Sequence, residues 1–99
     1  MKYKLSKEAL RDLEGIWHYT VGTWSREQAD RYYDLLVDEI EYVAENPRSG
    51  KDYSHVRKGY LRTNVKSHCI FYKINAEESA IEIIRILHQR MDIEARLND

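Results

Sequence analysis

The sequence predicts an α+β domain, in which a short N-terminal strand and an antiparallel helix hairpin pack on a mainly antiparallel sheet (β-α-α-β-β-β), followed by a short C-terminal tail. Two segments near the N-terminus repeat apolar residues every three to four positions, and three later segments are typical of strands. The chain has 99 residues, which is enough for one hydrophobic core, so we expect a single domain over residues 1–99.

The N-terminal segment is predicted to form a strand and then a helix. Residues 2–5 alternate in the manner of a short strand. Ser6 is a suitable N-cap, and the apolar residues after it predict a helix over about residues 7–21. Gly22 should end this helix, since glycine commonly follows the last helical turn.

A second helix is predicted directly after the first. Ser25 and Gln28 have the spacing of a capping box, in which each side chain bonds the other residue's backbone amide. The helix should end at Asn46-Pro47, because proline lacks the amide hydrogen and disfavours helix in the residue before it. Only about three residues join the two helices, so we expect an antiparallel hairpin.

The second half of the chain is predicted to form three strands. Residues 47–59 should be a loop, or a loop with one helical turn. The predicted strands span residues 60–65, 68–75 and 80–88. The last two form a hairpin around the turn at residues 76–79. The tail over residues 89–99 is short and polar, and we predict no helix there.

Both faces of the predicted sheet carry apolar side chains. In the last strand, simple alternation places Ile81, Ile83 and Leu87 on one face and Ile84 and Ile86 on the other. The helix hairpin can cover one face. The other needs either the tail or a partner chain, and we expect a partner because the tail is short.

The composition indicates a cytoplasmic protein without a metal or cofactor. The single cysteine, Cys69, cannot form an internal disulfide, no signal peptide is visible, and no apolar run approaches the ~20 residues that span a membrane. The histidines and the cysteine lack the spacing of metal ligands. Neither a glycine-rich phosphate loop nor a serine-nucleophile motif is present.

Charge is balanced overall but unevenly distributed. The net charge of −1 argues against a protein whose main role is to grip nucleic-acid phosphates. Residues 27–45 hold seven acidic residues and one basic residue, whereas residues 51–73 hold six basic residues and one acidic residue. These regions are either solvated surfaces or surfaces for charged partners.

Several basic residues offer a route to catalysis. A metal-free ribonuclease needs a base, an acid and cations that stabilise the transition state. The residues that could supply these groups are Arg57, Lys58, Arg62, His88 and Arg90. The same types of residue also keep edge strands soluble and block edge pairing. Residue types alone favour this simpler role.

The order of elements resembles the RelE/ParE toxin superfamily over nearly the whole chain. The run from Arg85 to Asp92 looks like the terminal signature of the ParE branch, and Asn46 to Gly50 is similar to that branch as well. The resemblance implies a toxin of a type II toxin–antitoxin module that inhibits DNA gyrase by binding, without chemistry of its own.

The resemblance also implies partners. A ParD-like antitoxin would bind operator DNA through an N-terminal ribbon-helix-helix and wrap the toxin with its C-terminal segment, so the toxin would meet operator DNA only indirectly. The RelE branch instead implies metal-free cleavage of messenger RNA on the ribosome, and a non-toxic interaction domain is a third alternative. The tail after Arg90 lacks the tyrosine or histidine base typical of RelE enzymes, and its acidic residues would repel a phosphate, which favours the ParE branch.

Candidate contact residues follow from this interpretation. We expect gyrase to contact the end of the last strand and the tail, at His88, Arg90 and Asp92. We expect the antitoxin to cover apolar and aromatic side chains that are partly exposed in the free toxin, and a basic pair that attracts acidic residues. The predicted antitoxin-binding residues are Trp17, Trp24, Tyr32, Arg57, Lys58, Phe71, Ile84 and Ile86.

Overall fold

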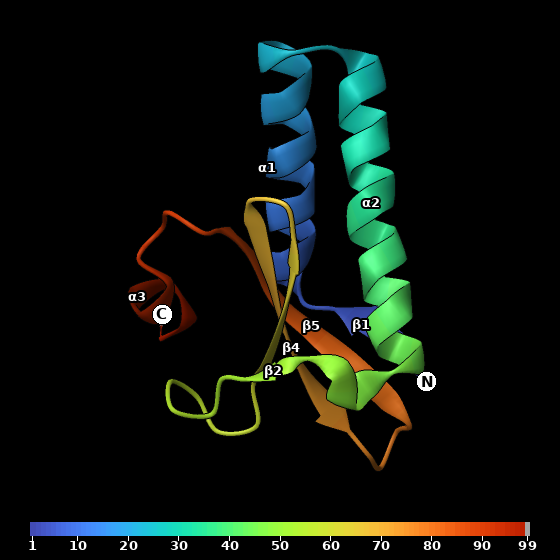
Figure 1. The fold of residues 1–99 in the computed structure, drawn as a ribbon, viewed down its shortest axis with the longest axis vertical. Coiled ribbons are helices and arrows are strands. Elements are labelled where there is room, and N and C mark those ends of the chain that lie inside the picture. Colours follow the sequence, from blue (N-terminus) through green and yellow to red (C-terminus); the bar gives the residue numbers. More distant parts are fainter. Residues whose placement is uncertain (99) are drawn as a thin grey trace.

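Two long helices form a hairpin that covers one face of a five-stranded sheet and extends beyond it (Figure 1). The structure is a computed structural model and describes residues 1–98. The elements are β1 (Lys2–Leu5), α1 (Lys7–Thr23), α2 (Arg26–Glu45), the 3-10 turn η1 (Pro47–Ser49), β2 (Lys51–Asp52), β3 (Leu61–Val65), β4 (His68–Asn75), β5 (Ala80–His88) and α3 (Ile93–Leu97). The predicted α+β class and element order are confirmed.

Both predicted helix starts are confirmed by their caps. The Ser6 hydroxyl accepts from the Ala9 amide at 2.9 Å, and the Ser25 hydroxyl accepts from the Gln28 amide at 3.1 Å. Helix α1 continues past Gly22 to Thr23. Both long helices are amphipathic, and within residues 1–98 no helix is long and apolar enough to span a membrane.

The sheet has the order β1-β5-β4-β3-β2, with β1 parallel to β5 and the other neighbours antiparallel. Strand β3 begins one residue later than predicted, at Leu61. Of the two alternatives for residues 47–59, the structure has the loop with one helical turn, η1. Strand β2 was not predicted, because its two residues, Lys51 and Asp52, are too few for a sequence pattern.

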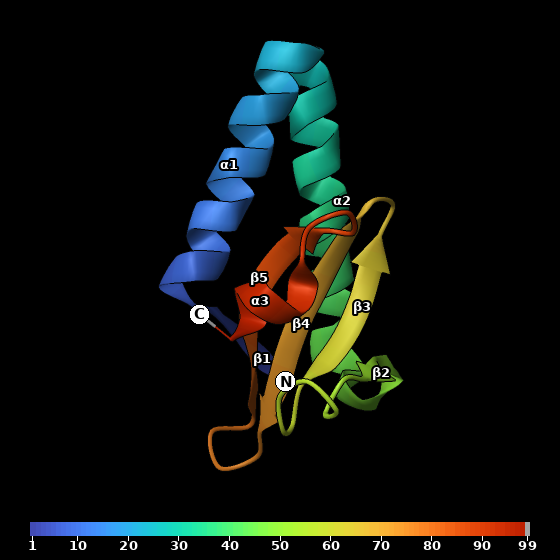
Figure 2. The ribbon, with the colours of Figure 1, turned by 90° about the vertical axis from the view of Figure 1, so that its left-hand side faces the viewer.

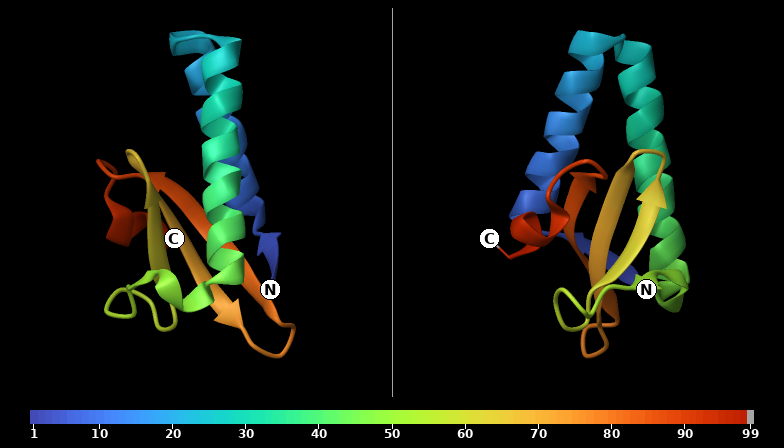
Figure 3. Two further views of the ribbon diagram at one scale, coloured as in Figure 1. Left: turned by 45° about the vertical axis from the view of Figure 1, so that its right-hand side comes forward. Right: turned by 60° about the vertical axis from the view of Figure 1, so that its left-hand side comes forward.

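The main core lies between the hairpin and the sheet, and the short α3 lies against the opposite face (Figures 2 and 3). The largest buried side chains of this main core are Leu13, Leu36, Ile40, Val43, Ile70, Tyr72, Ile81 and Ile83. At the base of the hairpin, the buried Tyr72 hydroxyl donates to the Pro47 carbonyl at 2.8 Å and accepts from the Gly50 amide at 3.0 Å. These bonds anchor the loop after α2 to the sheet.

A β-bulge reverses part of the predicted face assignment in β5. Phe71 pairs with Arg85 while Tyr72 pairs with Ile83, so Ile84 is an extra residue without a directly opposite partner. An extra residue inverts the alternation that follows it. Ile86 therefore joins Ile81 and Ile83 on the hairpin side, and Leu87 belongs to the cluster on the opposite face. The prediction that Ile86 and Leu87 lie on the reverse faces was wrong.

The second sheet face is covered by the chain's own tail, so the expectation of a partner chain there was wrong. Ile93 and Leu97, four residues apart on α3, pack against a cluster that includes Phe71 and Tyr60. Phe71 is fully buried and Ile86 is 2% exposed, which contradicts the prediction that both are partly exposed. A five-residue helix suffices because its first turn is capped and its last turn is bonded to β5.

Candidate functional site

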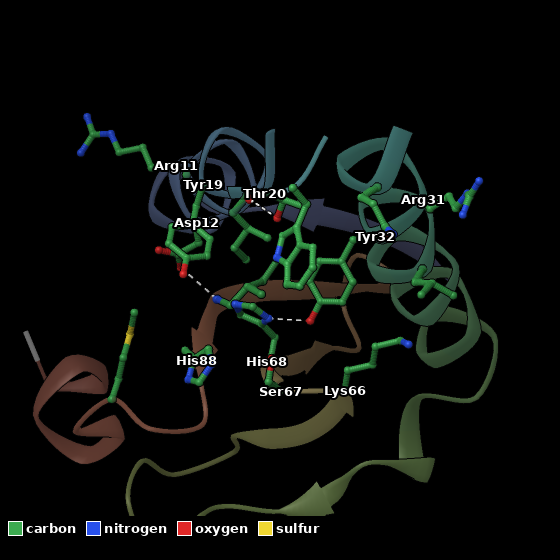
Figure 4. A pocket seen from close by; sticks show the side chains of 17 residues that line it. Arg11, Asp12, Tyr19, Thr20, Arg31, Tyr32, Lys66, Ser67, His68 and His88 are labelled. Carbon is green, nitrogen blue, oxygen red and sulfur yellow. Dashed lines mark hydrogen bonds between the residues drawn. The ribbon is translucent and has the colours of Figure 1, made fainter. Parts of the chain in front are cut away.

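A groove of about 890 Å³ lies between the hairpin and the ends of the central strands (Figure 4). Helices α1 and α2 form one wall, and the β3–β4 turn, the end of β5 and the start of the tail form the other. Much of the lining is apolar or aromatic: Ile16, Tyr19, Trp24, Leu35, Ile86 and Met91. Trp24 and Tyr19 are 73% and 71% exposed, so the groove presents large apolar surfaces to solvent.

A tyrosine and two histidines form the polar floor of the groove. The Tyr32 hydroxyl lies 2.6 Å from Nδ1 of His68 and 3.1 Å from the Val65 carbonyl. The His68 ring meets the His88 ring edge-on, with centroids 5.2 Å apart. Nδ1 of His88 accepts from the Arg90 amide at 3.1 Å, which leaves the proton of the neutral ring on Nε2.

Burial keeps the central histidine of this floor neutral. Burial is the main cause that lowers the pKa of His68 to about 4; the nearby His88 contributes to this shift and Asp12 opposes it. Burial also raises the pKa of the Tyr32 hydroxyl. Around neutral pH the floor therefore holds a hydrogen-bonded pair, Tyr32 and His68, in which neither side chain carries a charge.

An ion pair at the margin of the groove joins α1 to β5. The Asp12 carboxylate accepts from Nε and Nη2 of Arg85 at 2.8 and 3.1 Å, and also from the Ile86 amide at 2.9 Å. Nη1 of Arg85 donates to the Arg96 carbonyl in α3 at 3.4 Å. The side chain of Arg85 is 17% exposed and that of Asp12 is 15% exposed. Helix α1, strand β5 and the tail thus meet at one charged contact.

The groove brings together only part of the predicted antitoxin-binding set. Trp24, Tyr32 and Ile86 line it. Trp17 lines a separate recess of about 550 Å³ on the hairpin, where its indole NH donates to Asp30 at 3.0 Å.

The other predicted antitoxin-binding residues lie away from the groove. Phe71 is buried beneath α3, and Ile84 is half-buried beside the same cluster. Arg57 and Lys58 are exposed in the β2–β3 loop, where the Arg57 guanidinium reaches Asn98 at 3.5 Å. The structure therefore divides the predicted residues among several surfaces.

The three predicted gyrase-contact residues lie along one short segment at the end of β5. His88 is half-buried and lines the groove, whereas Arg90 and Asp92 are exposed. The Asp92 carboxylate accepts from the Ala95 amide at 3.2 Å and so caps α3. The Met91 amide donates to the His88 carbonyl at 2.9 Å. These bonds fix the turn that presents the three side chains.

Two of the five residues considered for ribonuclease chemistry, Arg62 and His88, lie on opposite faces of the sheet. Arg62 pairs with Phe71, on the α3 side, and its guanidinium lies 5.5 Å from the centre of the Tyr53 ring. His88 lies on the hairpin side, in the groove. Residues 1–98 contain no group of three or more His, Cys, Asp or Glu side chains that could hold a metal ion. The candidate base, His88, and the candidate cation Arg62 therefore do not converge on one position.

Sequence reasoning missed several residues of the groove. Tyr19 and Leu35 lie on the outer sides of their helices, and the signal for them was the presence of large apolar side chains outside the predicted core stripe. Asp12 gave no such signal. Its importance follows from Arg85, a charged residue within an otherwise apolar strand that needs a partner.

Comparison with known proteins identifies the family. Residues 3–93 match the family described as "ParE toxin of type II toxin-antitoxin system, parDE". The chain belongs to the ParE toxin family. Toxin ParE1 of Caulobacter vibrioides is 41% identical over 95 residues, which cover 96% of each chain. The predicted family and its place in a type II toxin–antitoxin system are therefore confirmed.

Two solved toxin–antitoxin systems contain chains of the same fold. A chain of the chromosomal ParDE system from P. aeruginosa superposes with a TM-score of 0.74 at 18% identity, over 89% of this chain and 95% of that one. A chain of the RelBE2 complex from Mycobacterium tuberculosis gives 0.68 at 19% identity, over 88% and 95%. At these identities the likeness shows the fold, which ParE and RelE toxins share.

Proposed function

We propose that this ParE-family toxin inhibits DNA gyrase by binding it and is neutralised in the cytoplasm by a ParD-like antitoxin. The observation that carries the proposal is the exposed turn from His88 to Asp92, which is held by local hydrogen bonds at the end of an apolar groove. A fixed, exposed turn is suited to contact with a partner, and the groove is suited to an amphipathic segment.

The antitoxin is proposed to occupy the groove. Trp24, Leu35 and Met91 are 73%, 42% and 42% exposed there, and a partner that covers them gains hydrophobic free energy. The same antitoxin would bind operator DNA through its ribbon-helix-helix, so that this chain meets operator DNA only indirectly.

Gyrase is proposed to contact the adjacent turn. A protein that only binds can stop an enzyme by preferring one of its conformational states, because the equilibrium shifts by the difference in affinity. The charged side chains exposed at the turn are Arg90 and Asp92, and His88 is half-buried beside them.

Neutralisation follows from the proximity of these two surfaces. His88 and Met91 line the groove and also belong to the proposed gyrase-contact segment. An antitoxin segment seated in the groove would contact both residues, so it would compete directly with gyrase.

The alternative ribonuclease function has less support in this structure. Arg62 and His88 lie on opposite faces of the sheet, so a phosphate held by one would not reach the other. A transition state with developing negative charge needs its stabilising groups converging on one position. The predicted set does not meet this requirement.

Expression in bacteria without the antitoxin tests the proposal. Filamentous cells with a DNA-damage response are expected, and Arg90→Glu should relieve them. Arg48→Glu, an equal charge change at an exposed residue of η1, serves as the matched control and should leave toxicity intact. Prompt loss of translation would instead identify a ribonuclease, and healthy growth of cells that contain the wild-type protein would identify a non-toxic interaction domain.

A further inference from the structure

The groove combines an apolar lining with a positively charged rim. Arg11, Arg31 and Lys66 line it, each from a different element. The single acidic residue of the lining is Asp12, whose carboxylate is already paired with Arg85 at 2.8 Å. Arg31 has Glu27 at 3.9 Å, but both side chains are more than 70% exposed, so that pair is weak. The seven acidic residues within residues 27–45 do not line the groove, so the lining itself favours a negatively charged ligand.

Lys66 occupies an unusual position in this rim. It lies in the tight β3–β4 turn with a φ of 50°, in the left-handed region where glycine or asparagine costs less than lysine. Figure 4 shows its side chain beside the polar floor, near Ser67 and Tyr32. The turn thus holds a cation at a backbone position that disfavours it, which suggests a binding role for the ammonium group.

We propose that the groove selects its antitoxin segment by charge: apolar side chains enter the groove while Asp or Glu side chains on the flanks pair with Lys66 and Arg31. This inference rests on the proposed function and adds the chemistry of the partner. An acidic amphipathic segment fits because the rim supplies cations on both sides, from α2 and from the β3–β4 turn. A basic segment with the same apolar face is repelled.

The segment after α2 offers a comparison within the same chain. Arg48 and Lys51 are also exposed cations, yet they lie outside the groove. If positive charge on the toxin acted only at long range, all of these cations would have similar effects on antitoxin affinity. If the antitoxin segment pairs directly with the groove cations, Lys66 and Arg31 have much larger effects than Arg48 and Lys51.

Binding of the purified, full-length cognate antitoxin to variants of the toxin tests the inference. Lys66→Glu combined with Arg31→Glu should weaken binding about 10–100-fold and reduce its salt dependence. The matched pair Arg48→Glu and Lys51→Glu makes the same charge change at two exposed residues outside the groove and should change the affinity less than about threefold. Equal losses in the two pairs, or no loss in the groove pair, would overturn the inference.

Lys66→Gly separates binding from folding. Glycine relieves the left-handed backbone, so this variant should melt at a higher temperature than the wild type and still bind about 3–5-fold more weakly. Unchanged affinity would contradict the binding role of Lys66. If the wild-type toxin does not bind the antitoxin at all, the proposed function fails. If the wild-type toxin binds but the substitutions at Lys66 and Arg31 leave the affinity unchanged, only the selection by charge is refuted.

Discussion

The Asp12–Arg85 contact provides the sharpest test of how the fold is held together. Asp12→Ala removes the carboxylate that accepts three hydrogen bonds. Two of these bonds come from the Arg85 guanidinium and one comes from the Ile86 amide. Breaking a fully buried ion pair from one side costs about 3–5 kcal/mol. Because the two side chains retain 17% and 15% exposure and Arg85 still reaches the Arg96 carbonyl, we expect a loss of about 2–3 kcal/mol.

Urea unfolding followed by circular dichroism measures this loss. In a domain of this size it corresponds to a fall in melting temperature of about 10–20 °C. Asp38→Ala, at an exposed position of α2, is the control and should change the free energy of unfolding by less than about 0.5 kcal/mol. The double variant with Arg85→Ala should cost less than the sum of the two single changes. A loss for Asp12→Ala no larger than the control's would refute the reasoning.

Three further changes test other parts of the structure. Gly50→Ala places a Cβ 2.3 Å from the Tyr72 hydroxyl and should lower the free energy of unfolding by about 2–3 kcal/mol in urea titrations, whereas Gly15→Ala meets nothing within 4 Å and should not destabilise. Leu97→Ala should cost about 2 kcal/mol and speed amide hydrogen exchange in α3 before the rest of the chain. Burial lowers the pKa of His68 to about 4 in the folded chain, whereas in the unfolded chain this histidine takes up its proton near pH 6.5. Stability should therefore fall between pH 6.5 and pH 4, by about 1–2 kcal/mol after allowance for partial exposure, and His68→Gln should remove that part of the slope.

Local sequence signals were sufficient for the order of the elements. The caps at Ser6 and Ser25 are short-range hydrogen bonds, and proline at position 47 ends a helix by its own chemistry. The predictions that were wrong concern features that depend on contacts between residues distant in sequence. The bulge at Ile84 inverts the faces of Ile86 and Leu87, and alternation alone contains no sign of it.

The tail shows why short elements are harder to predict. Helix α3 has five residues, too few to be stable alone, and it forms because Ile93 and Leu97 find an apolar sheet face and Asp92 caps its first turn. Two residues of the groove, Trp24 and Tyr32, were singled out as aromatic side chains of the hairpin, whereas Ile86 was assigned to the wrong face of the sheet. The cationic rim of the groove was not predicted, because residues 11, 31 and 66 converge only when the hairpin folds over the sheet.

Inhibition of purified gyrase is the most direct test of the proposed function. The isolated toxin is expected to inhibit DNA supercoiling and to increase the amount of cleaved DNA, and addition of the antitoxin should abolish both effects. Arg90→Glu should reduce the inhibition, while messenger RNA on purified ribosomes should remain intact. Unimpeded supercoiling at saturating toxin, together with cleaved messenger RNA on ribosomes, would contradict the account.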